Sequence, residues 1–218
     1  QLELLGEVPV LSIRTEPLQN PVNRLAKRLF DLTFSSLFLL TIFPFIYLFV
    51  GLIIKISSPG PIFFKQERNG ENGKIFKCYK FRSMKVNALS DSLQATKNDP
   101  RKTKFGNFLR KSNLDELPQF INVFKGEMSI VGPRPHMLKH TEEYSQLINK
   151  YMMRHLVKPG ITGWAQVTGY RGETKELSQM EGRVRRDLWY IENWTFLLDI
   201  RIMIKTVTNM FRGEKNAY

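Results

Sequence analysis

Two adjacent carboxylates, Asp115 and Glu116, stand in the middle of the chain within the stretch SNLDELPQFINVFKG. The stretch opens with residue types that cap helix N-termini, and its closing Gly126 suits a helix end. It therefore predicts a helix over about 115–125. The simplest interpretation of Asp115 is a helix cap, and the local sequence alone favours it.

A second interpretation of the pair is catalytic. Neighbouring helical residues point roughly 100° apart, so the two carboxylates need different roles. The positive end of the helix dipole would keep Asp115 ionised, and an ionised aspartate is a competent nucleophile at phosphorus. Glu116, turned aside, could hold Mg2+, which takes few protein oxygens and completes its shell with phosphate oxygens.

Basic residues around the pair indicate a site for phosphates. YKFRSM places Lys80 and Arg82 two apart, on one face of a predicted strand. FLRKSN brings Arg110 next to the dyad, and VGPRPH holds Arg134 between two prolines that limit the entropy lost on binding. Arginine suits bidentate phosphate contacts, whereas lysine acts as a point charge. Each residue alone is read more simply as a solvated surface charge, but the set favours a phosphate site.

Other candidates for chemistry are weaker. His136 and His140 have the i,i+4 spacing of a metal pair, but no third ligand supports it. Cys78 is the only cysteine, so no intrachain disulfide forms, and we interpret it as a core or surface thiol. The sequence has neither a Walker-type nor a Rossmann-type glycine motif.

The charge balance favours an anionic partner. The chain of 218 residues carries a formal charge of +13. Much of the excess lies in 55–111, where fourteen Lys and Arg face four Asp and Glu. Nucleic acid, acidic lipid headgroups and phosphorylated small molecules all fit this pattern.

An uncharged run over 32–54 determines the expected environment. As a helix it would be roughly 35 Å long, enough to cross a bilayer core. A buried core helix and a single membrane span are two alternatives. A re-entrant hairpin is the third, because Pro44 falls near the midpoint, where it favours a kink. Both flanks are basic, so a hairpin keeps both on one side, as the positive-inside tendency prefers.

The remaining pattern predicts a set of short elements. A strand over 8–13 leads into a linker, 57–61 is a turn, and the following residues around an Asn-Gly-rich loop form a β-hairpin. A polar loop or surface helix covers 87–104, and glycines punctuate a loop over 157–174. Further helices are predicted over 136–151, 176–190 and 196–212. The last is either a core helix or an interfacial amphipathic helix.

Several stretches, in order over about 24–208, closely resemble the bacterial sugar transferases, which are monotopic polyprenyl-phosphate phosphoglycosyl transferases. They are KRLFD, SPGPIFFKQERNG, FKCYKFRSM, LRKSNLDELPQFINVFKGEMSIVGPRP, VKPGITGWAQVTGYRGET and RRDLWYIENWTFLLDIRIMIKT. GYRGET, MEGRVRRDLWYIENW and the ending NAY look most like the undecaprenyl-phosphate glucose phosphotransferases. Asn113 departs from the family, which commonly has Ser or Thr there, so a hydroxyl role at this position would be lost.

The resemblance implies a fold and a location. The expected fold is α+β and mostly helical, a monotopic membrane protein with a helical hairpin broken at Pro44, a small β-hairpin and interfacial amphipathic helices. Residues 1–20 would be the exit from an upstream Rossmann-like region, 21–56 the re-entrant membrane helix and 57–218 the catalytic domain. The domain would lie on the cytoplasmic face of the bacterial inner membrane, in contact with its lipids.

The resemblance also implies a reaction. Asp115 would attack the β-phosphate of a UDP-sugar and release UMP, Glu116 would help hold Mg2+, and undecaprenyl phosphate would then take the sugar phosphate. Lys80, Arg110 and Arg134 are expected at the phosphates, with Asp187 as a further polar candidate, and the strand spacing described above adds Arg82 to this set. Glucose is the expected sugar, with galactose or another hexose as the alternative.

Two rival functions stay open at this point. One is a membrane-tethered nucleic-acid-binding module, which would bind more weakly in salt and would not depend on Asp115. The other is a non-catalytic membrane scaffold. The family resemblance favours the enzyme, so no nucleic-acid partner is expected. The oligomeric state is left open, with a homodimer among the alternatives.

Overall fold

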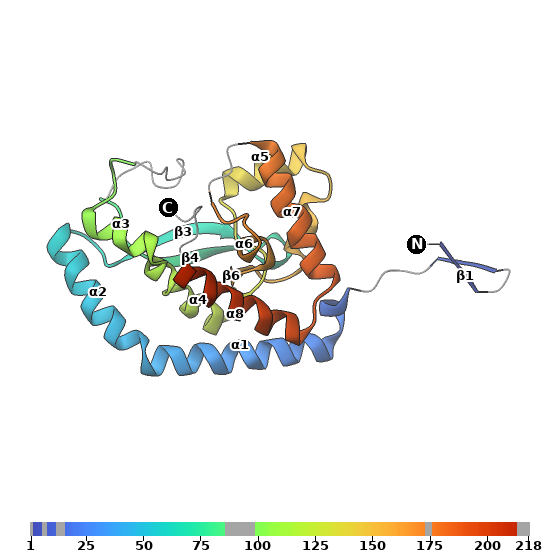
Figure 1. Cartoon of the computed structure of the whole chain (residues 1–218), viewed down its shortest axis with the longest axis horizontal. Coiled ribbons are helices and arrows are strands. Elements are labelled where there is room, and N and C mark those ends of the chain that lie inside the picture. Colours follow the sequence, from blue (N-terminus) through green and yellow to red (C-terminus); the bar gives the residue numbers. More distant parts are fainter. Residues whose placement is uncertain (1, 6–7, 12–15, 86–98, 173–175, 213–218) are drawn as a thin grey trace.

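The structure, a computed structural model, describes residues 2–5, 8–11, 16–85, 99–172 and 176–212 (Figure 1). This part of the chain is mostly helical, with three two-stranded sheets. The expectation of a mainly helical fold with a small amount of sheet is confirmed at this level.

The uncharged run forms a bent pair of helices. α1 (Pro21–Thr41) begins where the Asn20 side chain accepts a hydrogen bond from the Val22 amide, and α2 (Phe43–Ser57) follows at an angle of 56°. Pro44 occupies the first turn of α2, where a missing amide is tolerated. The predicted break is confirmed. Among the described residues, neither helix is long and apolar enough to cross a bilayer by itself, although the bent pair meets that criterion when taken together.

α1 is fastened to the rest of the chain along its length. It runs along one edge of the molecule, with α2 turning away from it toward α3 (Lys104–Lys111) and α8 (Phe196–Arg212) beside it (Figure 1). The rings of Phe30 and Phe196 meet edge to face at 5.3 Å. Lys27 Nζ lies 2.5 Å from a buried Asp199 carboxylate on α8. The bent pair is therefore packed into the fold and is not a separate appendage.

The predicted β-hairpin is confirmed. β3 (Phe63–Asn69) and β4 (Ile75–Phe81) pair antiparallel, with Asn72 and Gly73 at positive φ in the connection. Cys78 points into the core and is 1% exposed, and burial raises the pKa of its thiol. The core alternative for this cysteine is confirmed.

A second sheet joins distant parts of the chain. β5 (Ser129–Val131) pairs in parallel with β6 (Gly160–Thr162) inside the predicted glycine-punctuated loop. Glycine is required where the two segments meet, because a Cβ on Gly160 would lie 2.1 Å from the Gly132 amide nitrogen. The third sheet is a hairpin of β1 (Leu2–Leu5) and β2 (Val8–Leu11), of which the sequence predicts only the second strand.

The helices agree with the sequence in the C-terminal part and differ around the dyad. α7 (Leu177–Glu192) and α8 confirm the predictions, and α5 (Leu138–Leu147) is shorter than its predicted range. α3 is not predicted by the pattern, and most of the predicted polar segment 87–104 lies outside the described residues. The remaining elements are the 3-10 turns η1 (Pro17–Gln19), η2 (Glu71–Gly73), η3 (Leu114–Glu116) and η4 (Tyr151–Leu156), with α4 (Gln119–Lys125) and α6 (Trp164–Val167).

α8 is a core helix, one of the two alternatives that the sequence leaves open, and it also has an exposed apolar face. Its inner face contributes the fully buried Ile202 to the core formed with β4, α4, β5 and α7. Its outer face leaves Leu197 and Ile204 exposed. The helix is thus a core helix on one side and an apolar surface on the other.

Candidate active site

The dyad does not lie on a continuous helix. Asp115 and Glu116 are buried in the 3-10 turn η3, and α4 starts only at Gln119. Asn113 precedes the turn with a φ of 58°, a left-handed conformation that asparagine tolerates better than most residues. Among the described residues, no side-chain hydrogen bond caps η3 or α4. The predicted helix is confirmed over Gln119–Lys125, and Gly126 ends it at a φ of 84°. Its predicted start at Asp115 and the capping role of Asp115 are wrong, because a 3-10 turn occupies that stretch and α4 begins only after Pro118.

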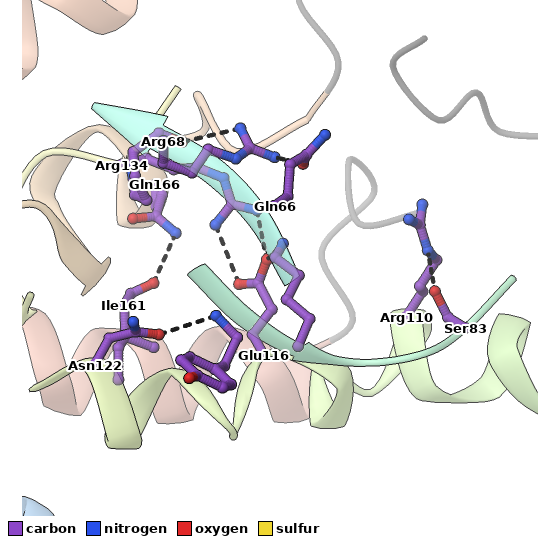
Figure 2. Close-up of polar contacts among 12 residues, drawn as sticks. Gln66, Arg68, Ser83, Arg110, Glu116, Asn122, Arg134, Ile161 and Gln166 are labelled. Atoms are coloured by element: carbon purple, nitrogen blue, oxygen red, sulfur yellow. Dashed lines mark hydrogen bonds and ion pairs between the residues drawn. The ribbon is translucent and has the colours of Figure 1, made fainter. Parts of the chain in front are cut away.

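Glu116 is held by two cations from different elements. Lys80, on β4, donates to its Oε1 at 2.7 Å. Arg134, in the loop after β5, donates through two nitrogens, at 2.6 Å to Oε1 and 3.1 Å to Oε2 (Figure 2). Burial acts to raise the pKa of Glu116, but the charges of Arg134 and Lys80 outweigh it and hold that pKa well below its usual range. Glu116 is therefore a permanently ionised carboxylate at neutral pH.

Asp115 has the opposite environment. In the part of the chain that the structure describes, its carboxylate takes part in no hydrogen bond or ion pair. Burial, followed by the adjacent charge of Glu116, raises the pKa of Asp115 to about 6, against the lowering effect of the nearby cations. The expected effect of a helix dipole on Asp115 is wrong, since η3 is a single turn. Asp115 is an unpartnered carboxylate that is ionised at neutral pH and becomes protonated just below it.

The other predicted basic residues separate into two groups. Arg110, at the end of α3, donates from Nε to Ser83 Oγ at 2.9 Å, and its charge acts to lower the pKa of Asp115 (Figure 2). Arg82 lies just past the end of β4 and is directed away from the dyad. Its guanidinium is buried and donates to the carbonyls of Ser58 and Pro59 at 2.7 and 2.8 Å. The structure thus places Lys80, Arg110 and Arg134 around the dyad, and uses Arg82 to hold the turn after α2.

Asp187 is also placed away from the dyad. It is buried on α7 and accepts two hydrogen bonds from Arg154, at 2.6 Å from Nη2 and 3.2 Å from Nε. The same Nη2 donates to the main-chain carbonyl of Arg134 at 2.8 Å. Asp187 is therefore connected to Glu116 through Arg154 and Arg134.

Two residues of this region carry little signal in the sequence. Arg154 lies in the 3-10 turn η4, in a stretch with no motif that marks it as buried. The charge of Arg171 acts on Glu116 and lowers its pKa. The glycines on either side of Tyr170-Arg171 are the signal that could have identified Arg171, because they mark a close turn.

The dyad fits a divalent cation that relies mainly on its substrate for ligands. The described residues contain no group of three His, Cys, Asp or Glu that could hold a metal. His136 Nδ1 lies 2.6 Å from the Tyr151 hydroxyl, so this ring nitrogen is already engaged. Mg2+ commonly takes one or two protein carboxylates, with substrate phosphates and water as its other ligands. Glu116 is a carboxylate donor of this type, and its two oxygens also accept hydrogen bonds from Lys80 and Arg134.

Comparison with known proteins gives a consistent match. Residues 22–213 fit the family model described as bacterial sugar transferase. The chain is 54% identical over its full length to a UDP-glucose:undecaprenyl-phosphate glucose-1-phosphate transferase of Escherichia coli (strain K12), covering 47% of that protein. Proteins of the same name from Xanthomonas campestris pv. campestris and Klebsiella pneumoniae are 50% and 51% identical over 99% of the chain, with 45% and 46% of their own lengths covered. The chain thus spans about half the length of these relatives.

The electrostatic coupling within the dyad gives the first prediction. Replacing Glu116 with Gln removes the neighbouring negative charge that raises the pKa of Asp115. We expect the pKa of Asp115 to fall from about 6 toward the ordinary aspartate range. Carboxyl NMR titration of protein with labelled aspartate measures it, with Asp115→Asn to assign the signal. An unchanged or higher pKa in Glu116→Gln would contradict the described coupling.

Proposed function

The chain belongs to the bacterial sugar transferase family, and we propose that it transfers a hexose 1-phosphate from a UDP-sugar to undecaprenyl phosphate, releasing UMP. Glucose 1-phosphate is the proposed group, because the relatives reported above are named for it. The observation that carries the proposal is the pairing of an unpartnered Asp115 with a cation-held Glu116. Transfer to undecaprenyl phosphate would be the first membrane step of exopolysaccharide, capsule or O-antigen assembly.

Asp115 is the proposed nucleophile. Its carboxylate oxygen forms a bond to the β-phosphorus of the UDP-sugar, and the bond from that phosphorus to the bridging oxygen breaks. UMP leaves with the bridging oxygen, and the sugar phosphate remains on Asp115 as an acyl phosphate. Because Asp115 attacks only when ionised, UMP release is expected to slow as the pH falls through about 6.

The second step restores the carboxylate. An oxygen of undecaprenyl phosphate attacks the same phosphorus, the bond to Asp115 breaks, and undecaprenyl-diphospho-sugar is released. The attacking phosphate is already anionic near neutral pH, so no strong general base is needed. Two successive steps at one site also mean that UMP can leave before the second anion arrives, which limits repulsion between the two substrates.

The basic residues around the dyad have a role in both steps. Lys80, Arg110 and Arg134 place positive charge where negative charge gathers on the phosphates. Arg134 presents a planar fork, which matches two phosphate oxygens as it matches the two oxygens of Glu116. Glu116 is the residue that would help hold Mg2+, and a bound Mg2+ would neutralise phosphate charge.

The bent helices are proposed as a re-entrant membrane segment, in a unit comprising 21–56. Apolar side chains are exposed along both helices, including Leu37 at 62% and Phe49 at 71%. Lys55, at the C-terminal end of α2, is exposed and would lie at the headgroup layer, whereas Lys27 on the other flank is buried against Asp199. The exposed apolar face of α8 would lie against the same layer. The catalytic part, 57–218, would then face undecaprenyl phosphate from the cytoplasmic side of the inner membrane.

Nucleotide release provides the test of the reaction. With a UDP-glucose donor, undecaprenyl phosphate and Mg2+ in detergent, the chain should release UMP. Asp115→Asn should abolish this release, because an amide is not a nucleophile of comparable strength. Glu142→Gln, which alters an exposed carboxylate on α5, serves as the matched control and should retain activity. Release of UDP would indicate simple glycosyl transfer, and full activity in Asp115→Asn would refute the nucleophile. A panel of UDP-sugars in the same assay identifies the preferred donor.

Membrane topology provides a separate test. We expect a cysteine introduced at residue 20 and another at residue 218 to be labelled from the same side of inverted inner-membrane vesicles, after Cys78 is replaced by Ala. The reason is that a helix pair that enters and returns leaves both of its ends on one side. A thiol reagent that does not cross the bilayer, added outside and then inside, measures the accessibility. Labelling of the two positions from opposite sides would contradict the re-entrant path.

A further inference from the structure

The main chain of the Pro-Arg-Pro segment 133–135 is held through its three carbonyls. Its two prolines have no amide hydrogen, so they cannot donate to neighbouring strands. The three successive carbonyls accept instead, in chain order, from the Gly160 amide at 2.9 Å, from Arg154 Nη2 at 2.8 Å and from Arg68 Nη1 at 3.3 Å. Each donor comes from a different part of the chain. The backbone that carries the Arg134 side chain is therefore fixed from three directions.

Arg154, which donates to the Arg134 carbonyl, differs from the other two donors in the free-energy cost of burying its charge. The Arg154 side chain is 1% exposed and that of its partner Asp187 is 2% exposed. Taking two charges out of water is expensive, and an apolar pair of similar volume is often as stable or more stable. The guanidinium is also packed over the Tyr151 ring, 5.5 Å from its centroid. An apolar pair could fill the same volume, but it could not donate a hydrogen bond to the Arg134 carbonyl as Arg154 does.

The contacts form one continuous chain from α7 to the dyad. Asp187 orients Arg154, Arg154 holds the main chain of Arg134, and the Arg134 side chain grips Glu116. Asp187 itself is buried and accepts two hydrogen bonds from Arg154. This placement does not support the substrate contact that the family resemblance implies for Asp187.

We propose that Arg154 and Asp187 are positioning residues, which fix the guanidinium of Arg134 between Glu116 and the phosphates of the sugar donor. This inference rests on the proposed function for its substrate. Neither residue touches the reacting atoms. Their effect on the reaction passes through Arg134, so it should disappear when Arg134 is absent.

A double-mutant cycle tests this dependence. The first variant replaces both partners with apolar side chains, Arg154→Met with Asp187→Leu, so that no buried charge is left unpaired. The second is Asp187→Asn, which keeps a hydrogen bond acceptor for Arg154. Each is combined with Arg134→Ala. A shift of about 1 Å in a positioned group can cost on the order of 100-fold in rate, and we expect a loss of roughly that size in kcat/KM for the apolar pair.

Non-additivity is the expected result. The combined variants should be no slower than Arg134→Ala alone, because the residue that transmits the effect is already gone. Thermal unfolding identifies which variants remain folded. If the apolar pair does not fold, the comparison is made with Asp187→Asn instead. The exposed ion pair of Arg24 and Glu71 provides a matched control, and Arg24→Gln with Glu71→Gln should retain activity. Losses that multiply with that of Arg134→Ala would overturn the proposal, as would full activity in the apolar pair.

A second readout requires no turnover. If Arg134 is released from its position, the sugar donor loses a phosphate contact, so UDP-glucose should bind more weakly in both variants when each also carries Asp115→Asn to prevent turnover. Adding Arg134→Ala should weaken binding no further. Unchanged affinity in a folded variant would refute the positioning role. Failure of the unmodified chain to release UMP would instead refute the proposed function and leave this measurement interpretable.

Discussion

The arrangement of this site depends on one buried anion, the Glu116 carboxylate. An ionised carboxylate removed from water is tolerated only when cations and hydrogen bonds replace its hydration. Lys80 and Arg134 supply these contacts, and they come from β4 and from the loop after β5. The pairing therefore brings three segments that are far apart in the sequence to one point. It also divides the dyad, since the cations are committed to Glu116 and the adjacent Asp115 is left unpartnered with a raised pKa.

The bent helical pair contributes to this geometry as well as to the proposed membrane contact. Arg28 on α1 donates to the carbonyls of Val123 and Phe124, at the C-terminal end of α4, where a positive charge is favourable. Asp31, one turn further, accepts from the Ile130 amide on β5 at 3.0 Å. α4 follows the dyad and β5 leads to Arg134. α1 thus contacts both the helix that follows the dyad and the strand that leads to Arg134. A change in the tilt of α1 would therefore move the groups around Glu116.

Local patterns in the sequence predict the elements whose formation depends on interactions between residues close together in the chain. The break near Pro44, the hairpin of β3 and β4, and helices α7 and α8 follow from a missing amide, an Asn-Gly turn and helical periodicity. The surroundings of the dyad are not predictable in this way. Asn113 is a good cap by type, yet it adopts a left-handed conformation that ends one turn and begins another. Arg82 and Lys80 share a predicted face, but only tertiary packing decides that Arg82 binds the carbonyls after α2. Arg154 has no motif, and its importance appears only with its burial against Arg134 and Asp187.

Peptide mapping of the trapped intermediate tests the central claim most directly. The chain is mixed with UDP-glucose and Mg2+ without undecaprenyl phosphate, quenched in acid and digested, and the peptide that contains Asp115 and Glu116 is sequenced by mass spectrometry. The division of roles within the dyad predicts one added hexose phosphate, located on Asp115. The adduct should appear in proportion to released UMP and disappear when undecaprenyl phosphate is added. An adduct located on Glu116, or UMP release with no adduct on either residue, would contradict the account.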